Sequence, residues 1–229
     1  MHNLKPLIIT FSGIDGAGKS TQIQRLREYL IANGIPVKEL TFWDNVAVFA
    51  GMRSGFSRRV LQSDGSVGTP EKPAERRDKN KQNIPLLFGR SVLQLLDVLN
   101  LNRVFRQAKA ESAGVIIFDR YIYDQLAALP MDSSVARIYA RLLLKLAPKP
   151  DLSFVLDAIP EIARARKPEY PLDFMRKYRS SYLRLPDFTD VHIVSAGEIE
   201  DVHNAIVAKV EHHLANAYAE TTVGSVVAA

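Results

Sequence analysis

The glycine-rich run at residues 13–20 has the residue types and the spacing to hold a chain of phosphates. It reads Gly-Ile-Asp-Gly-Ala-Gly-Lys-Ser and fits the pattern G-x-x-x-x-G-K-[ST]. Glycines let such a loop curl until successive backbone N–H groups point at phosphate oxygens, and a helix that begins there adds the positive end of its dipole. Lys19 can then reach the β- and γ-phosphates, and the Ser20 hydroxyl can ligate Mg²⁺. The motif therefore predicts a site for a nucleoside triphosphate.

The segments on either side of this loop have the patterns that the motif requires. Residues 7–12 are apolar and β-branched, as in a buried parallel strand, and residues 21–32 carry apolar side chains at helical spacing. With both present, we favour the nucleotide site over a chance glycine-rich turn. The residues that we expect to contact the nucleotide are Gly13, Asp15, Gly16, Ala17, Gly18, Lys19, Ser20 and Thr21.

A second pair of polar residues, Asp119 and Arg120, follows the apolar run at residues 114–118. An acidic residue at the C-terminal end of a buried parallel strand lies at the sheet edge where the glycine loop also lies. We therefore expect Asp119 to hold Mg²⁺ opposite Ser20, directly or through water. The alternative is that Asp119 caps the following helix. The Arg120 guanidinium has the fork geometry that suits a phosphate.

Strand and helix patterns alternate along the rest of the chain. Alternation of this kind predicts an α/β fold, and with the glycine loop a three-layer P-loop NTPase fold whose five-stranded parallel sheet is flanked by helices. We expect one domain over residues 1–217, with a mobile polar insert at 63–83, and a flexible tail at 218–229. The predicted strands are residues 7–12, 36–42, 114–118, 152–156 and 191–194, and the longer predicted helices are residues 21–32, 85–111, 134–146, 172–185 and 198–214.

The composition narrows the class of protein. The chain of 229 residues is 47% hydrophobic, enough for one α/β domain, and no apolar stretch approaches the ~20 residues that span a bilayer. It lacks cysteine, which excludes disulfides and cysteine-ligated zinc, and we expect a cytoplasmic enzyme without a membrane partner. The net charge of +5 would suit nucleic acid, but an enzyme that handles phosphates also concentrates Arg and Lys around its cleft. We therefore do not expect nucleic acid as a partner.

Several segments resemble the thymidylate kinases, a family of nucleoside monophosphate kinases. The two central motifs are similar to F-x-G-x-D-G-x-G-K-S-T-Q at residues 11–22 and D-R-Y at residues 119–121. Residues 156–161, which read L-D-A-I-P-E, together with Arg166 resemble the family run L-D-x-x-P-E-x-x-x-x-R. Residues 174–185 resemble the helix after the family's lid, and residues 195–202 resemble its adenine-side loop and last helix.

The resemblance implies an activity and a set of roles. It implies transfer of the γ-phosphate of ATP to a nucleoside monophosphate, dTMP by default, with Mg²⁺ as cofactor, and a homodimer through helices that flank the sheet. Lys19 would follow the transferring group, Arg120 would orient the acceptor phosphate, and Asp15 matches the family's loop acid, which contacts the sugar 3′-hydroxyl. Family members with glycine at position 16 supply a further cation from a mobile lid. Here the lid is a short segment, residues 164–173, and its first candidate is Arg166, ahead of Arg164 and Lys167.

The chain departs from the family pattern where the acceptor base would bind. The family has Phe and Arg four residues apart on the helix before the third strand, whereas Phe88 and Arg90 are two apart. Ala128 stands at the place of a family tyrosine that crowds the ribose 2′-hydroxyl. The further departures are Asp124 and Gln125 in place of serines, and Trp43 or Asp44 in place of an arginine. The acceptor residues that we expect are Asp15, Phe88, Arg90 and Arg120.

Alternatives to this function and the role of the polar insert remain open at this stage. A P-loop ATPase or nucleotide switch associated with nucleic acid would explain the basic surface, and a kinase for another nucleotide or for a nucleoside would explain the altered pocket. The polar insert, rich in Arg and Lys, is either a solvated loop or a flap that closes over the acceptor.

Overall fold

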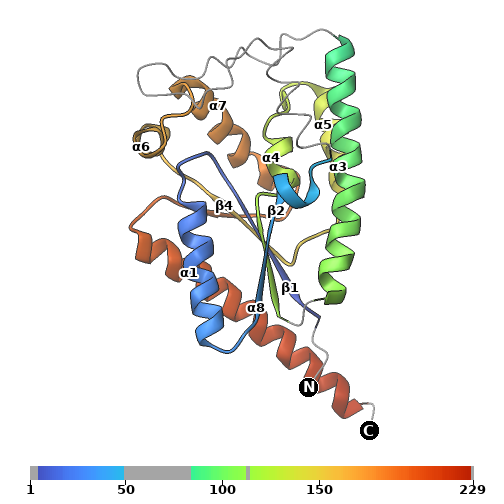
Figure 1. The fold of residues 1–229 in the computed structure, drawn as a ribbon, viewed down its shortest axis with the longest axis vertical. Helices are drawn as coiled ribbons and strands as arrows, with labels where there is room; N and C mark the ends of the chain where they lie inside the picture. Colours follow the sequence, from blue (N-terminus) through green and yellow to red (C-terminus); the bar gives the residue numbers. More distant parts are fainter. Residues whose placement is uncertain (1–4, 49–83, 112–113, 228–229) are drawn as a thin grey trace.

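A parallel β-sheet of five strands forms the centre of the computed structural model, which describes residues 5–48, 84–111 and 114–227, with the backbone alone at 84–88 and 217–227 (Figure 1). The strand order is β2-β3-β1-β4-β5, and every pair is parallel. The strands are β1 (Leu7–Ser12), β2 (Val37–Thr41), β3 (Val115–Asp119), β4 (Leu152–Leu156) and β5 (His192–Val194). The sheet confirms the predicted fold class.

Helices cover both faces of the sheet. They are α1 (Lys19–Ala32), α3 (Ile84–Glu111), α4 (Ile122–Leu126), α5 (Ser134–Leu146), α6 (Pro160–Arg166), α7 (Leu172–Leu183) and α8 (Ile199–Val227). Two short turns, η1 (Phe42–Val46, π-helical) and η3 (Leu185–Asp187, 3-10), complete the described elements. None of the helices in the described ranges combines the length and the hydropathy that a bilayer span requires.

The last helix differs most from expectation. We expected it to end at residue 214, but α8 runs to Val227 and takes in most of the segment predicted as a flexible tail. Residues 215–223 contain no Pro or Gly and are rich in alanine, the best helix former, so nothing in them stops the helix. The polar insert predicted at 63–83 lies outside the described residues.

Two apolar layers fill the space between sheet and helices, one on each face. Successive residues of β1 point to opposite faces, so Leu7, Ile9 and Phe11 pack against α1 and α8, whereas Ile8 packs against α3, α4 and α5. These side chains are almost fully buried, and each contributes about 1.5–3 kcal/mol to folding. The sheet is therefore a rigid platform for the loops at its edge.

The strand register brings the chemical residues to one edge. Phe11 pairs with Asp119, and the backbone N–H of Arg120 donates to the carbonyl oxygen of Phe11 at 2.9 Å. Because all strands run in the same direction, the ends of β1, β3 and β4 deliver the glycine loop, Arg120 and Asp157 to the same side of the molecule.

Candidate active site

The glycine loop lies between β1 and α1, and its backbone requires glycine. Gly13, Gly16 and Gly18 have φ angles of 141°, 82° and 89°, which L side chains rarely adopt. A Cβ at Gly16 would also lie 2.3 Å from the carbonyl oxygen of Ala163 in α6. The loop therefore packs directly against α6, the helix that leads into the predicted lid, and this arrangement leaves no room for a larger residue at position 16.

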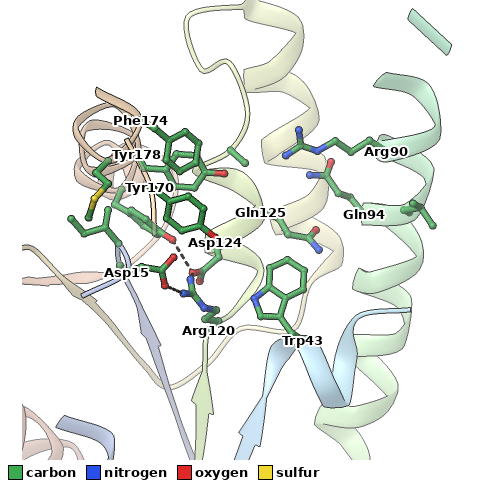
Figure 2. Close-up of a pocket in the computed structure, with 16 residues that line it drawn as sticks. Asp15, Trp43, Arg90, Gln94, Arg120, Asp124, Gln125, Tyr170, Phe174 and Tyr178 are labelled. Atoms are coloured by element: carbon green, nitrogen blue, oxygen red, sulfur yellow. Dashed lines mark hydrogen bonds and ion pairs between the residues drawn. The ribbon is translucent and has the colours of Figure 1, made fainter. Parts of the chain in front are cut away.

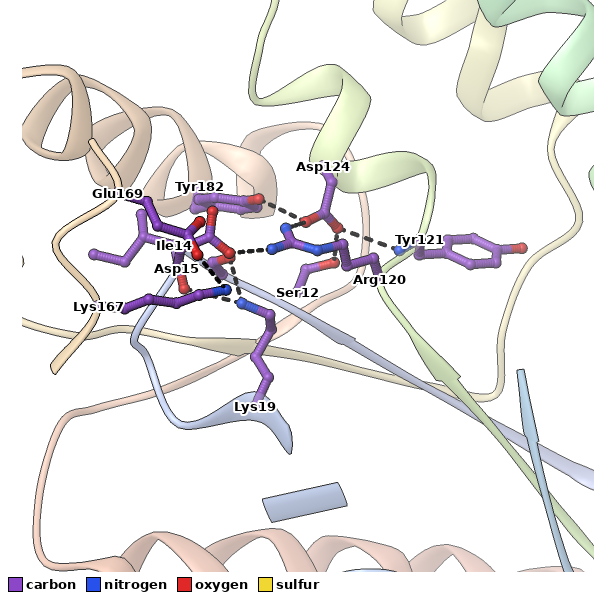
Figure 3. A network of polar contacts seen from close by, with 11 residues as sticks. Ser12, Ile14, Asp15, Lys19, Arg120, Tyr121, Asp124, Lys167, Glu169 and Tyr182 are labelled. Carbon is purple, nitrogen blue, oxygen red and sulfur yellow. Dashed lines mark hydrogen bonds and ion pairs between the residues drawn. The ribbon is translucent and has the colours of Figure 1, made fainter. Parts of the chain in front are cut away.

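Lys19 opens α1 with its side chain folded back over the loop. Its Nζ donates to the carbonyl oxygens of Gly13 and Ile14, both at 2.9 Å, and the side chain is buried (Figure 3). Burial and, after it, the positive charge of Arg120 lower the pKa of Lys19 to about 8, against the opposing effect of the nearby carboxylates. The ammonium is thus held by neutral carbonyl groups, which phosphate oxygens can replace.

Arg120 lies between two carboxylates. Its guanidinium donates to Asp15 on the glycine loop and to Asp124 Oδ1 on α4, the second at 2.7 Å (Figure 3). Burial opposes the charge, but Asp124 and Asp15 outweigh it and raise the pKa of Arg120 above its ordinary value. The backbone at Arg120 has a φ of 68°, a strained conformation for a residue with a side chain. The two ion pairs hold it there.

Asp124 is the centre of this network. From the sequence it was noted only as a departure from the family pattern. Its carboxylate also accepts hydrogen bonds from Ser12 Oγ (2.7 Å), Tyr182 Oη (2.8 Å) and the backbone N–H of Tyr121 (3.2 Å). The spacing of four residues between Arg120 and Asp124 did not indicate the pair, since Arg120 precedes α4 with a left-handed backbone and the rule for helical neighbours does not apply to it. Asp124 fixes the direction of the Arg120 fork.

A cavity of about 400 Å³ opens beside Arg120, a volume within the range of small-molecule sites (Figure 2). Asp15 and Arg120 form one side of it, and Tyr170, Phe174 and Tyr178 contribute an aromatic wall. Of the predicted acceptor residues, Asp15, Arg90 and Arg120 line this cavity, whereas the side chain of Phe88 lies outside the described part. The remaining lining residues are Gly13, Ile14, Trp43, Leu93, Gln94, Asp124, Gln125, Ala128, Met175 and Tyr182.

Asp119 and Ser20 both line a second cavity, of about 350 Å³, between α1 and the ends of β2 and β3. Asp119 Oδ1 is buried and accepts no hydrogen bond from the described residues. Burial raises the pKa of Asp119, although Lys19 and Arg120 act in the opposite direction. The helix α4 begins after Tyr121, whose N–H is satisfied by Asp124, so Asp119 is not the cap of that helix.

A buried carboxylate oxygen without a partner among the described residues, in a cavity that a serine also lines, fits a hard cation such as Mg²⁺. Within the described ranges, no group of three or more His, Cys, Asp or Glu side chains could hold a metal alone. The chain would thus supply only part of the coordination of Mg²⁺, with phosphate oxygens and water as the remaining ligands.

The basic residues of the lid have different surroundings. Arg166 ends α6 with an exposed side chain and makes no hydrogen bond or ion pair within the described part of the chain. The Nε of Arg164 is buried without a hydrogen-bond partner among the described residues, and Lys167 pairs with Glu169 at 3.1 Å. The guanidinium of Arg166 therefore has no partner among the described residues, whereas the ammonium of Lys167 is held by Glu169.

Two ion pairs that the sequence analysis did not foresee tie α7 in place. Arg179 binds Asp157, just after β4, through two parallel hydrogen bonds of 2.6 and 2.8 Å. Arg176 donates to Glu161 of α6 at 2.6 Å. The bidentate pair of Arg179 and Asp157 fixes orientation as well as distance, so α7 and the part of the aromatic wall that it carries are held against the sheet edge.

Curated proteins similar to this chain share one description. A probable thymidylate kinase of Thermococcus kodakarensis is 31% identical over 220 residues, which cover 90% of this chain and 97% of the relative. The chain belongs to the thymidylate kinase family. A probable thymidylate kinase of Archaeoglobus fulgidus is 28% identical over 91% of this chain and 96% of its own, and the thymidylate kinase of Chlorobium limicola is 25% identical over 90% and 94%. No family model matches the chain. Membership in the thymidylate kinase family confirms the resemblance drawn from the motifs.

Proposed function

We propose that this chain is a thymidylate kinase, which transfers the γ-phosphate of ATP to dTMP and yields ADP and dTDP. The observation that carries the proposal is the Asp15–Arg120 ion pair, because it joins the phosphate loop to the 400 Å³ cavity. A donor site and an acceptor site that share one arginine suit transfer between two phosphates. The names of the similar proteins support the choice of dTMP.

Each residue of the site has a separate role in an in-line transfer. An oxygen of the acceptor phosphate attacks the γ-phosphorus, and the bond to the oxygen that bridges the β- and γ-phosphates breaks. Lys19 follows the transferring group, Arg120 orients the acceptor phosphate, and the exposed Arg166 supplies a further cation from the lid. Ser20 and Asp119 would hold Mg²⁺, which neutralises charge on the β- and γ-phosphate oxygens.

We also propose that the enzyme is a homodimer, as the family resemblance implies, and that it works in the cytoplasm. Apolar side chains are exposed on α3 and on α5. These two helices pack against each other (Figure 1). Monomers rarely expose a contiguous apolar surface of this kind. The exposed residues of this apolar face are Val92, Leu95, Leu96 and Leu99 on α3 and Val135, Ile138, Leu142 and Leu146 on α5.

A screen for ADP release tests the proposal. The enzyme is incubated with ATP and Mg²⁺ and each nucleoside monophosphate in turn, with a nucleoside and single-stranded DNA as further arms. We expect ADP release that depends on dTMP. Release of inorganic phosphate that needs no acceptor, or that DNA stimulates, would instead identify the chain as an ATPase.

A further inference from the structure

The segment that connects α6 to α7, residues 167–171, is short and contains two prolines. It reads Lys-Pro-Glu-Tyr-Pro, and no glycine occurs between positions 160 and 171. The rings of Pro168 and Pro171 fix their φ angles, so these two positions cannot take up the large backbone rotations of a hinge. We call this segment the strap. Its sequence favours a fixed connection over a lid that opens and closes.

Backbone hydrogen bonds and an ion pair hold the first half of the strap. The N–H of Lys167 donates at 3.0 Å to the carbonyl oxygen of Ala163, the same oxygen that lies against Gly16 of the glycine loop. The N–H of Glu169 donates to the carbonyl oxygen of Lys167 at 2.9 Å, and the two side chains pair at 3.1 Å. The strap therefore starts from the end of α6 that touches the phosphate loop.

An aromatic ladder continues from the second half of the strap along α7 (Figure 2). Its four rings are four residues apart, the spacing of neighbours on one face of a helix. Tyr170 of the strap lies against Phe174 with ring centroids 5.3 Å apart, and Phe174 lies against Tyr178 at 4.4 Å. Tyr182 follows at 6.3 Å, and its hydroxyl donates to Asp124 at 2.8 Å. The ladder thus joins the strap to the buried carboxylate at the centre of the polar network.

Asp157 fixes the helix that carries the ladder. It follows β4 directly, its side chain is 14% exposed, and both of its oxygens accept hydrogen bonds from Arg179 of α7. Arg176 and Glu161 form a further pair between α7 and α6, which pack against each other. The edge of the sheet, the two helices and the strap between them are therefore connected as one unit.

We propose that the strap is a fixed wall of the acceptor cavity rather than a lid that closes on substrates, and that Asp157 is the positioning residue that keeps it in place through Arg179. Tyr170 of the strap lines the cavity together with Phe174 and Tyr178. This side of the cavity is then complete before a substrate binds, whereas a closing lid would complete it only afterwards. The inference rests on the proposed function for its choice of ligands.

Two spin labels measure the position of the strap, and the absence of cysteine from the chain allows them to be attached at chosen sites. Asp173→Cys places one label next to the strap, at a side chain that is 95% exposed, and Ile31→Cys places the other on α1. Pulsed electron paramagnetic resonance gives the distance between them in the free enzyme, with ADP and Mg²⁺, and with ADP, Mg²⁺ and dTMP. We expect one distance that changes by less than about 3 Å among the three samples. A larger change, or several distances in the free enzyme, would overturn the inference.

Two variants of the labelled protein should release the strap. Asp157→Asn removes the charge that holds Arg179, and the double substitution Pro168→Gly and Pro171→Gly supplies the hinges that the strap lacks. In each variant we expect several distances in the free enzyme, which return to one when ADP, Mg²⁺ and dTMP bind, and a rise of at least about threefold in the KM for dTMP. A loss of stability alone would lower the melting temperature without adding distances.

Asp132→Asn is the matched control, because Asp132 holds Arg184 at the other end of α7, at 2.9 Å. Its distances and its KM should equal those of the labelled parent. A single, unchanged distance in Asp157→Asn would overturn the role of Asp157, and Arg179→Lys, which cannot bind both oxygens, decides this point if Asp157→Asn fails to fold. If dTMP does not bind at all, the proposed function fails, whereas the distances in the free enzyme and with ADP still decide whether the strap is fixed.

Discussion

Five charged side chains lie close together where β1 and β3 end: Asp15, Lys19, Asp119, Arg120 and Asp124. The partners of Arg120 and Lys19 indicate which of these two side chains moves when a substrate binds. Arg120 is held by the carboxylates of Asp15 and Asp124, whereas Lys19 is held by two carbonyl oxygens. The hydrogen bonds of both side chains are charge-assisted, but only those of Arg120 join two opposite full charges and so add their mutual attraction. We therefore expect Arg120 to keep its position when substrates bind and Lys19 to exchange its partners for phosphate oxygens.

The lowered pKa of Lys19 predicts that ATP binding takes up a proton. With a pKa of about 8, close to half of the free enzyme has a neutral Lys19 at pH 8, and the phosphates favour the charged form. We expect uptake of about half a proton at pH 8 and almost none at pH 6.5, with affinity falling as the pH rises through 8. Calorimetry in two buffers of different ionisation enthalpy measures the uptake.

Lys19→Arg is the matched control for proton uptake, because arginine keeps its proton throughout this range. That variant should show no uptake at pH 8. Equal uptake by wild type and Lys19→Arg would show that another group carries the proton.

At Asp119, removal of the charge should weaken the binding of Mg²⁺ without loss of the fold. Asp119→Asn keeps the size of the side chain but loses the attraction for a cation. We expect the Mg²⁺ concentration for half-maximal activity to rise at least about tenfold, or 1.4 kcal/mol, with the melting temperature within a few degrees of wild type. A Mg²⁺ titration that is identical in both proteins would contradict the metal role.

The strands and the long helices could be predicted from the sequence, whereas the short helices and the contacts between two elements could not. The strands are runs of apolar residues and the long helices repeat their apolar positions, so both leave a period in the sequence. The helices α4 and α6 have only five and seven residues, too few for a period, and the π-helical turn η1 has no local signal. The contact between Asp97 and Gln125 joins residues on two helices, and only the tertiary packing brings them together.

The contact between α6 and the glycine loop can be tested with two glycines. Gly16 and Gly34 both have positive φ, but a Cβ would clash only at Gly16, since nothing lies within 4 Å at Gly34. Gly34→Ala should cost about 1–2 kcal/mol from the backbone alone. Gly16→Ala should cost more than that and should raise the KM for ATP at least tenfold. Urea unfolding measures the free energy of unfolding, and initial rates measure the KM for ATP. Equal losses of stability in the two variants would mean that α6 does not press on the loop.

The helix α3 contributes both to the wall of the 400 Å³ cavity and to the apolar face formed with α5. Gln94 and Asp97 point inward from this helix, whereas Leu95, Leu96 and Leu99 are exposed. A second copy on this face would brace the helix that carries Gln94 and Asp97. In the proposed homodimer, one helix would thus connect the contact between the two copies to the cavity.

A charge in the apolar face should separate the homodimer. Leu99 and Ile138 are 55% and 66% exposed in the single chain, so Leu99→Glu and Ile138→Glu should leave the fold intact and block association. Ile31→Glu, on the opposite layer in α1, is the control, with a parent side chain that is 47% exposed. Light scattering after size exclusion should find about 51 kDa, twice the mass of the 25.6 kDa chain, for wild type and the control, and 25.6 kDa for the two variants. A monomeric wild type would refute the homodimer.

Transfer of phosphate from ATP to dTMP can be tested by the products of one reaction. Purified enzyme, ATP, Mg²⁺ and dTMP are incubated, and all nucleotides and inorganic phosphate are quantified by chromatography and ³¹P NMR. The expected result is one dTDP for each ADP, with no inorganic phosphate, and loss of both products in Lys19→Ala. ADP formed with an equal amount of inorganic phosphate, and dTMP left unchanged, would contradict the proposed function.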